Sequence, residues 1–311
     1  MNIYNPEFFE QKQFESLNYN QVSKALDRHE VIEAKVIKCT ANNDLVVDIG
    51  ENITGIIRFN EIEYHPDNSP IKPVASTSKV GKHVKFYVNE IEDNKDGTYT
   101  AYCSRKELQK SCYENYISKL VPGDVIDAYF VKATGYGAFC DIGCGIIAFL
   151  YANNISVTHV IDPVVEMAAT TKMKVVVKSI DSKTLRVELT HKELLGTWEE
   201  EASNFSEGDV IFGTVLSVEE YGAFIRIGQN ISGLSDNEYK VDINTGDVVS
   251  VRVVKINRHN MKIKLNIIDR IDNDKENNKF KFRYRNIPKH IDKWVYSIPE
   301  SKKVVESRFD A

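Results

Sequence analysis

The chain has 311 residues, 42% of them hydrophobic, and a formal net charge of −5. This length admits two or three domains, and the acidic balance excludes a protein that coats nucleic acid by bulk electrostatic attraction. No apolar run reaches the ~18 residues of a membrane span, so we expect no membrane contact. The five cysteines are odd in number and scattered, and no signal-peptide pattern opens the chain, which favours a cytoplasmic location.

Residues 1–29 are predicted to form an N-terminal helical arm. Asn5, Pro6 and Glu7 offer a cap, a first-turn proline and an acidic residue, which is the pattern of a helix start. Apolar residues follow at helical spacing: Phe14, Leu17, Val22, Ala25 and Leu26. We expect one or two helices here that brace the first of the repeated units described next.

Internal repeats organise the rest of the chain. The tetrapeptide Gly-Asp-Val-Ile at residues 123–126 returns 85 residues later at residues 208–211. With the same offset, the string Gly-Tyr-Gly-Ala-Phe at residues 135–139 returns as Glu-Tyr-Gly-Ala-Phe at residues 220–224. The register is then predicted to slip, so that Gly145 matches Gly233. These two copies are assigned to residues 122–190 and 207–270.

A third, degenerate copy precedes them in residues 30–104. Its predicted strands cover residues 31–36, 45–50, 55–58, 81–88 and 98–103. Each copy contains about five short strands rich in Val and Ile and separated by Gly, Asn and Asp, which fits a small closed Greek-key barrel. The predicted fold class is therefore mainly β, with three tandem five-stranded OB-fold barrels.

The joins between copies, residues 105–121 and 191–206, are predicted to be short helices. Ser104 and Thr190 each stand three residues before a glutamate, Glu107 or Glu193, which is the spacing of a capping box. Apolar residues follow at helical intervals in both joins. We expect stiff helical linkers rather than flexible ones.

Aromatic residues in the second and third copies are candidates for base stacking. Tyr136 and Phe139 lie in the second copy, and Tyr221 and Phe224 in the third. Residues three apart on a straight strand face opposite sides, so both rings can share the outer face only if a bulge or glycine kink intervenes. The alternative places Phe139 and Phe224 in the barrel core.

These strings resemble the S1 RNA-binding domain, a family found in ribosomal protein S1, polynucleotide phosphorylase and ribonuclease E. The resemblance implies an RNA face made of two aromatics, a histidine, an Asp or Asn and a basic residue. Carried over, it adds Asp181 and Arg186 in the second copy and Asn257 and Lys262 in the third. At the histidine position it puts Ala148, Asp236 and, in the first copy, Arg58.

The first copy has residues 42–44, Asn-Asn-Asp, where the aromatics should be, so it is interpreted as a structural or protein-docking copy. Residues 194–200 and the stretch from His290 to Ser297 extend the resemblance. They are similar to short S1-like RNA-binding proteins of low-GC Gram-positive bacteria, often labelled ribosomal protein S1.

The C-terminal extension, residues 271–311, is basic and aromatic in an acidic chain. Phe280, Phe282 and Tyr284 alternate with Lys279, Lys281, Arg283 and Arg285. This strand periodicity predicts one apolar side that, with Trp294 beyond it, folds back on the third barrel, and one basic side that contacts RNA phosphates. The alternative is a solvated edge strand whose lysines discourage aggregation.

No catalytic constellation is present, so the chain is predicted not to be an enzyme and to need no cofactor. It has no P-loop, no dinucleotide-binding glycine fingerprint and no H-E-x-x-H motif. The seven histidines are dispersed and interpreted as surface groups. Cys140 and Cys144 could form half of a metal site, but no second ligand pair follows them, so core or turn residues are the preferred interpretation and no metal is expected.

The leading hypothesis is a non-catalytic protein that binds single-stranded RNA, and mRNA in particular, in translation or mRNA handling. The small ribosomal subunit is a further expected partner. The alternative is a protein-interaction scaffold or an accessory factor of a ribosome or ribonuclease complex, because OB barrels also bind proteins.

Overall fold

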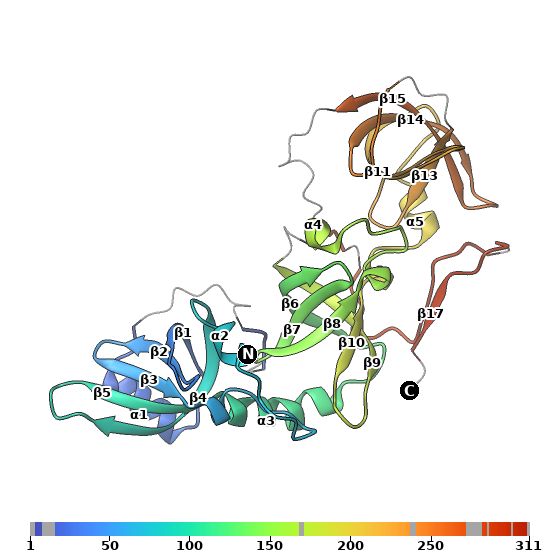
Figure 1. Cartoon of the computed structure of the whole chain (residues 1–311). Coiled ribbons are helices and arrows are strands. Elements are labelled where there is room, and N and C mark those ends of the chain that lie inside the picture. Colours follow the sequence, from blue (N-terminus) through green and yellow to red (C-terminus); the bar gives the residue numbers. More distant parts are fainter. Residues whose placement is uncertain are drawn as a thin grey trace.

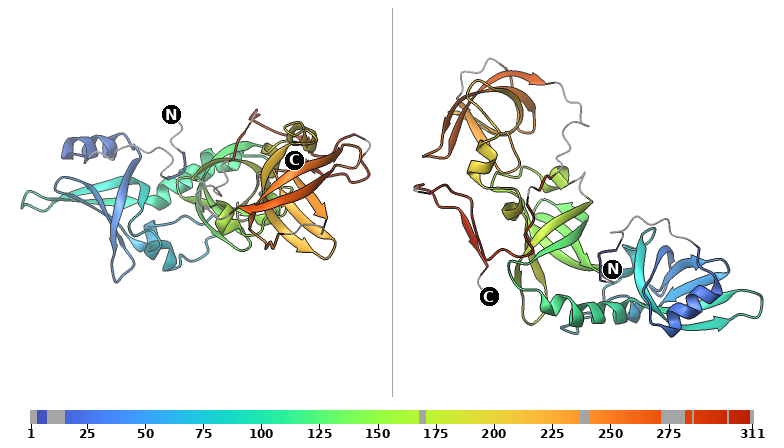
Figure 2. Two further views of the ribbon diagram at one scale, coloured as in Figure 1. Left: turned by 90° about the horizontal axis from the view of Figure 1, so that it is seen from above. Right: turned by 180° about the vertical axis from the view of Figure 1, so that it is seen from behind.

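The chain forms three closed five-stranded barrels in a row that bends at the second barrel (Figures 1 and 2). The computed structural model describes residues 4–7, 16–167, 171–236, 241–271, 282–284, 286–299 and 301–309. The predicted fold class, mainly β with tandem OB-type barrels joined by short helices, is confirmed. Among the described residues, no helix has both the length and the apolar character needed to cross a bilayer.

The first barrel has the strand order β1-β2-β3-β5-β4. Its strands are β1 (Ile32–Cys39), β2 (Leu45–Gly50), β3 (Ile53–Ile57), β4 (His83–Asp93) and β5 (Tyr99–Ser104). Two short helical turns, η1 (Phe59–Glu61) and α2 (Val74–Thr77), connect β3 to β4. Helix α1 (Tyr19–Asp27), capped by Asn18, packs Val22 and Ala25 into this barrel's core. The predicted bracing helix is therefore confirmed, while Phe14 lies outside the described residues.

The second and third barrels repeat this architecture. The second consists of β6 (Val125–Thr134), β7 (Gly137–Gly143), β8 (Ile146–Tyr151), β9 (Lys172–Ile180) and β10 (Val187–Thr190), with η3 (Ala152–Asn154) and α4 (Pro163–Met167) between β8 and β9. The third consists of β11 (Val210–Glu219), β12 (Gly222–Arg226), β13 (Ser232–Asp236), β14 (Val248–Asn257) and β15 (Lys262–Ile271). The first strand of every barrel is bulged, at Val36/Lys38, Phe130/Lys132 and Val215/Ser217. A bulge bends a strand, which helps each sheet to close.

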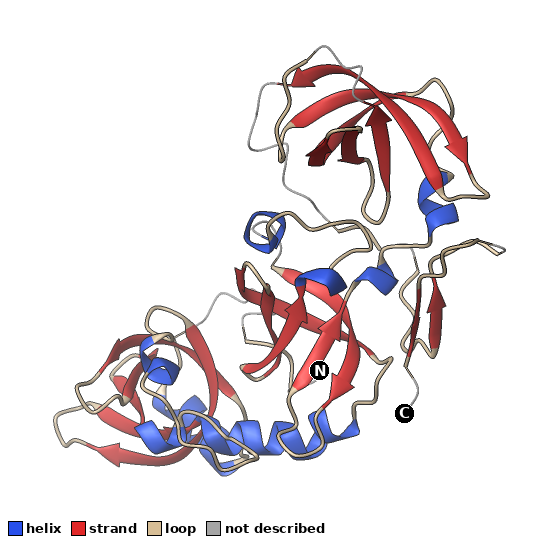
Figure 3. Ribbon diagram, turned by 45° about the vertical axis from the view of Figure 1, so that its right-hand side comes forward, coloured by secondary structure: helices blue, strands red, loops and turns tan. Residues whose placement is uncertain are grey.

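The two joins differ from one another. In the first, α3 (Arg105–Asn115) runs along both neighbouring barrels (Figure 3) and is followed by η2 (Ile117–Lys119). The Ser104 hydroxyl accepts a hydrogen bond from Glu107 N at 2.9 Å, as the cap predicts. The second join splits into η4 (Lys192–Leu194) and α5 (Trp198–Ala202), so the expected single helix is wrong there.

The break in the second join occurs at Gly196, whose φ of +94° a helix does not allow. Thr190 donates its hydroxyl hydrogen to the Glu193 carboxylate at 2.6 Å instead of capping a helix. Thr197 caps α5 in its place, in a reciprocal pair with Glu200.

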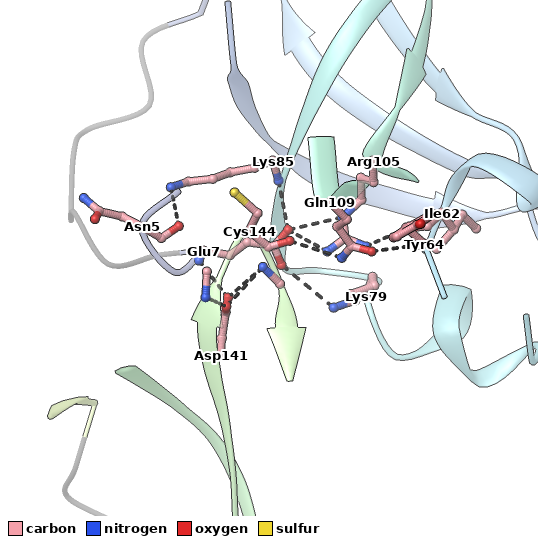
Figure 4. A network of polar contacts seen from close by, with 12 residues as sticks. Asn5, Glu7, Ile62, Tyr64, Lys79, Lys85, Arg105, Gln109, Asp141 and Cys144 are labelled. Carbon is pink, nitrogen blue, oxygen red and sulfur yellow. Dashed lines mark hydrogen bonds and ion pairs between the residues drawn. The ribbon is translucent and has the colours of Figure 1, made fainter. Parts of the chain in front are cut away.

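A buried polar network joins the first two barrels (Figure 4). No helix begins at Asn5, and Glu7 instead lies buried between the barrels, so that part of the arm prediction is wrong. Arg105 Nη2 lies 2.7 Å from Glu7 Oε1, and Glu7 N donates to Asp141 Oδ2 of the second barrel at 2.8 Å. Burial opposes charge on Glu7, but Arg105 and Lys79 outweigh it and hold the pKa of Glu7 below its ordinary value. The ion pair thus supplies the partner that a buried arginine requires.

The C-terminal extension lies against both the second and third barrels. The Phe282 ring packs at 4.3 Å from the His191 ring, and the Tyr284 hydroxyl lies 2.9 Å from His191 Nε2. Trp294, in the hairpin of β16 (Lys293–Val295) and β17 (Glu306–Arg308), joins the core cluster of the third barrel. The predicted docking on the third barrel is therefore right for Trp294 and wrong for Phe282 and Tyr284, which pack on the second.

Strand pairing identifies one equivalent buried position in all three barrels, two residues beyond the last parallel pair of the third and fifth strands: Arg105, His191 and Ile267. The prediction of a surface histidine is wrong for His191, because the C-terminal extension covers it. Its Nδ1 faces the Ile155 carbonyl oxygen, so Nδ1 donates and Nε2 accepts the Tyr284 hydroxyl hydrogen. Burial lowers the pKa of His191 to about 4.

Cys140 and Cys144 are both buried in the core cluster of the second barrel. In the described ranges, no group of three or more His, Cys, Asp or Glu side chains is placed to hold a metal ion. The core interpretation of these cysteines therefore holds.

Candidate nucleic-acid interface

An aromatic row crosses the outer face of the second barrel. Phe139 of β7 is paired across the sheet with Phe149 of β8, and their ring centroids lie 4.9 Å apart, edge to face. Tyr151 continues the row at 4.7 Å from Phe149. On the opposite side, Lys132 of β6 places its Nζ 5.5 Å from the centroid of the Phe139 ring. Together these groups form an aromatic surface with a cation at its border, which is the arrangement that base stacking requires.

The structure decides between the core and the outer face for Phe139 and Phe224. Phe139 stands between the fully buried Ala138 and Cys140, and is itself only half-buried and absent from the core cluster. Phe224 has the same relation to its neighbours in the third barrel. Both rings lie on the outer face.

Glycine turns bring the preceding tyrosines to the same end of each barrel. Tyr136 is 82% exposed and Tyr221 is 60% exposed. Gly137 has a φ of +150°, and a Cβ there would lie 2.2 Å from the Leu150 carbonyl oxygen. Gly222 meets the same restriction. Only glycine fits these positions, and Tyr221 ends 6.3 Å from Phe224, edge to face.

The strand register corrects the histidine position in the second barrel. Gly137 pairs with Tyr151, and Gly222 pairs with Asp236. The offset of 85 residues thus continues through β8 and β13, so the predicted slip that matched Gly145 with Gly233 is wrong. Ala148 is equivalent to Gly233 and faces the core, while Tyr151 occupies the position expected for histidine.

Phe149, Tyr151 and Lys132 were therefore missed by sequence reasoning. The signal was present as period-2 alternation in β8, where Ile147, Phe149 and Tyr151 point outward between buried neighbours. Two aromatic residues among the outward positions of one strand mark this face.

The predicted hairpin residues divide into two kinds. Asp181 Oδ1 accepts hydrogen bonds from Lys183 N at 3.1 Å and from Thr184 N at 2.7 Å, so it caps its own turn. Asn257 does the same for Asn260 N at 3.0 Å. Arg186 and Lys262 are exposed. Each lies two residues before the first residue of β10 or β15 that pairs with β8 or β13, respectively. They extend the outer face, whereas Asp181 and Asn257 hold turns.

The corresponding face of the third barrel has fewer rings. Leu234 stands opposite Phe224, where the second barrel has Phe149. Asp236 Oδ2 lies 2.8 Å from Lys264 Nζ, so a local cation on this face is already paired with a carboxylate.

The first barrel has aliphatic residues in the same row. Val46 and Ile56 occupy the positions of Phe139 and Phe149. Arg58 lies over the ring of Tyr102 of β5, 5.1 Å from its centroid. β2 and β3 carry no aromatic rings, in agreement with the prediction that the first copy lacks the aromatic residues of the other two.

The predicted basic row of the C-terminal extension is only partly described. Lys279, Lys281 and Arg285 lie outside the described residues. Arg283 is exposed and outside any strand, and its carbonyl oxygen accepts from Gln229 Nε2 of the third barrel at 2.8 Å.

Comparison with known proteins places this architecture in context. Residues 26–98 match the family model "S1 RNA binding domain". The predicted resemblance to the S1 domain family is confirmed. The match falls on the first barrel, so the expectation that this copy fits the family poorly is wrong. That copy keeps the inward-facing pattern of β1 to β3 and differs in its outer rings.

The chain is also similar to whole S1-type proteins. It is 28% identical over 268 residues to the small ribosomal subunit protein bS1 of Staphylococcus aureus, covering 83% of this chain and 66% of that protein. For bS1 of Staphylococcus epidermidis the identity is 28%, with 80% and 64% covered. The chain thus spans slightly less than two thirds of these relatives. A solved multidomain protein with nucleic acid binding domains from Streptococcus pneumoniae is 14% identical, with 76% and 73% covered and a TM-score of 0.25.

Proposed function

We propose that this protein binds single-stranded RNA, without catalysing a reaction, by stacking bases on the outer faces of the second and third barrels. The observation that carries the proposal is the outer-face aromatic row of Phe139, Phe149 and Tyr151, bordered by Lys132 and preceded in the chain by the exposed Tyr136. Every base has a π-face, so such a row binds RNA with little sequence preference. The S1 domain similarity and the bS1 relatives support this assignment.

Stacking has to supply most of the affinity, because the chain is acidic overall. The exposed cations Arg186 and Lys262, with Arg283 of the extension, provide local phosphate contacts. Asp181 and Asn257 contribute by holding the hairpins that carry those cations. Lys281 and Arg285 complete the proposed phosphate row.

The cellular role that we propose is supported by the relatives, which are named as small ribosomal subunit proteins. We place the chain in the cytoplasm, in translation or mRNA handling, with mRNA as its RNA and the small ribosomal subunit as an associated particle.

Fluorescence anisotropy with a labelled single-stranded RNA tests the proposal. The double variant Tyr136→Ala, Tyr221→Ala should lose affinity by about 1–3 kcal/mol for each base that stacks on a removed ring. Val74→Ala, at an exposed site on α2 of the first barrel, is the matched control. Unchanged affinity in the double variant would remove the stacking claim.

A protein-interaction scaffold is the second candidate, favoured by the first barrel. Its outer row has Val46 and Ile56 in place of rings, and Glu90 and Glu92 lie on β4, on the far side of β5 from β3. A scaffold would purify without RNA, as judged by the ratio of absorbance at 260 and 280 nm, and would co-purify a ribosomal or nuclease partner.

A further inference from the structure

The repeated Gly-Asp-Val-Ile segment of the second barrel binds another part of the same chain. Val125 N donates to the Lys289 carbonyl oxygen at 3.0 Å, and Ile291 N donates to the Gly123 carbonyl oxygen at 2.9 Å. Between these two bonds, His290 Nδ1 lies 2.7 Å from Asp124 Oδ1. The C-terminal extension thus adds a short antiparallel segment to the free edge at the start of β6.

Side chains complete this contact. Ile291 and Tyr284 of the extension and Val125 of β6 all pack against the same buried cluster, which consists of Val176, Leu194 and Phe309. The bound segment therefore has a simple chemistry: an extended backbone, a basic side chain facing an aspartate, and an aliphatic residue directly after it.

The third barrel presents the same backbone edge at residues 208–211. Gly208 N donates to Val253 O and Val253 N donates to Asp209 O, both at 2.8 Å. The second barrel has the same two bonds at 2.8 Å, from Gly123 N to Val177 O and from Val177 N to Asp124 O. Gly123 and Gly208 have φ values of +95° and +99°. In an antiparallel ladder alternate residues turn their N–H and C=O groups outward, so Val210 N points away from β14, as Val125 N points away from β9.

The side chains beside this edge are apolar and exposed. Val210 is 53% exposed and Phe212 is 70% exposed. The sister barrels have acidic residues at the position of Phe212: Glu33 faces Lys85 across the strands, and Asp127 forms an ion pair with Lys174 at 2.6 Å. In the third barrel Phe212 faces Ser250 instead. Of the three barrels, only the third has an exposed ring at this position in place of an acidic residue. The described part of the extension pairs with the equivalent edge of the second barrel and not with that of the third.

We propose that residues 208–212 of the third barrel form a docking edge for an extended peptide segment of a partner protein. The segment would place a histidine or lysine against Asp209 and an aliphatic residue against Val210 and Phe212. The Asp209 carboxylate is held in the same way as that of Asp124. Asp209 Oδ2 accepts a hydrogen bond from Ser206 N at 2.7 Å, and Asp124 Oδ2 accepts one from Val121 N at 2.9 Å. In the second barrel, Asp124 Oδ1 is the oxygen that meets His290.

A peptide fits this edge better than RNA does. Two carboxylates, Asp209 and Glu207, stand beside it and repel phosphates, whereas they attract a basic side chain. Arg252 Nη1 donates to the Gly208 carbonyl oxygen at 3.2 Å, where Ile291 N donates in the second barrel. The Arg252 side chain is exposed and must move aside when the partner binds.

The probe for this site is a fluorescein-labelled peptide with the sequence of residues 286–292, Asn-Ile-Pro-Lys-His-Ile-Asp, titrated with the full chain. Val210→Pro removes the outward N–H without touching the β14 ladder and should weaken binding about tenfold, the equivalent of one backbone hydrogen bond. Phe212→Asp, which restores the residue type of the sister barrel, should weaken it by a similar factor. Phe224→Ala, on the stacking face, is the matched control and should leave peptide binding unchanged.

Circular dichroism of each variant verifies the fold, and the same variants are titrated with single-stranded RNA. Peptide binding that is equal in Val210→Pro, Phe212→Asp and the unsubstituted chain would place the peptide elsewhere and overturn the proposal. If Phe212→Asp loses RNA affinity and the unsubstituted chain binds no peptide, the edge is a nucleic-acid surface. This result would also overturn the proposal. The proposal does not depend on RNA binding at the stacking face, since Phe224→Ala reports on that face separately.

Discussion

The second and third barrels share one backbone plan and differ in the residues placed on it. In the second barrel Phe149 stands opposite Phe139, whereas in the third barrel Leu234 stands opposite Phe224. Two residues later, Tyr151 stands where the third barrel has Asp236, which is paired with Lys264. At the equivalent buried position beyond the parallel strand pair, His191 stands where the third barrel has Ile267. The same barrel fold therefore accommodates different residues at these three positions. The differences there distinguish the surface and the packing of the two copies.

The largest expected effect concerns the buried position. The pKa of His191 is lowered from its ordinary 6.5 to about 4, so between these pH values the unfolded chain binds a proton that the folded chain does not. Stability therefore falls as pH decreases through this window, by about 3 kcal/mol in full at roughly 1.4 kcal/mol per pKa unit. Urea midpoints measured from pH 7.5 to pH 4.5 should show this decline.

The matched variant is His191→Leu, which copies the apolar residue type of the third barrel. It should lower stability at neutral pH, because Tyr284 loses a hydrogen-bond partner, and should flatten the dependence on pH. An identical slope in the variant and the unsubstituted chain would show that the decline comes from other groups.

The next prediction concerns the aromatic row. Phe149→Ala should weaken RNA binding by about 1–3 kcal/mol if a base stacks there, whereas Leu234→Ala should change it by less. Leu234→Phe should strengthen binding by the third barrel, because it restores the ring of the second. Anisotropy titrations of the three variants check this, and equal losses in Phe149→Ala and Leu234→Ala would mean that the difference in rings has no bearing on RNA.

The basic row of the extension should affect the salt dependence more than the affinity. Replacing Lys281, Arg283 and Arg285 together with Gln should reduce the slope of log affinity against log salt by about 2, at roughly 0.7 per phosphate on a single strand. Titrations between low and moderate salt measure the slope. An unchanged slope, with the circular dichroism spectrum intact, would support a solvated segment.

The smallest effect is expected at the ion pair of the third barrel. Asp236→Asn removes the carboxylate that holds Lys264 and should raise RNA affinity by a few tenths of a kcal/mol, since exposed ion pairs contribute roughly 0–1 kcal/mol. Lys264→Gln is the complementary variant and should lower affinity. A decrease in both would show that Asp236 orients the lysine usefully.

Sequence reasoning predicted the barrels well because inward alternation and glycine turns are local signals. It named Tyr136, Phe139, Tyr221 and Phe224 as candidates for base stacking, which stays a prediction, and left open which face the phenylalanines occupy. The register of β8 was misjudged because Gly145 resembles Gly233, although Ala148 fills that position. Cross-strand pairing establishes the register, and the alternation within β8 places Phe149 and Tyr151 on the outer face.

Long-range contacts were beyond sequence patterns altogether. Glu7 meets Arg105 across 98 residues, and Tyr284 meets His191 across 93 residues. Nothing in the local sequence of Asn5 to Glu7 distinguishes a helix start from a segment buried between barrels. Similarly, the splitting of the second join depended on Gly196, one residue within an otherwise helical pattern.

The most direct test of stacking on the second and third barrels is zero-length ultraviolet crosslinking to single-stranded RNA, with the attached residues identified by mass spectrometry. The account predicts crosslinks at Tyr136, Phe139, Phe149 or Tyr151, and weaker ones at Tyr221 or Phe224. Crosslinks confined to other surfaces, such as Tyr102 of the first barrel or Phe212 of the third, with none on these rings, would contradict it.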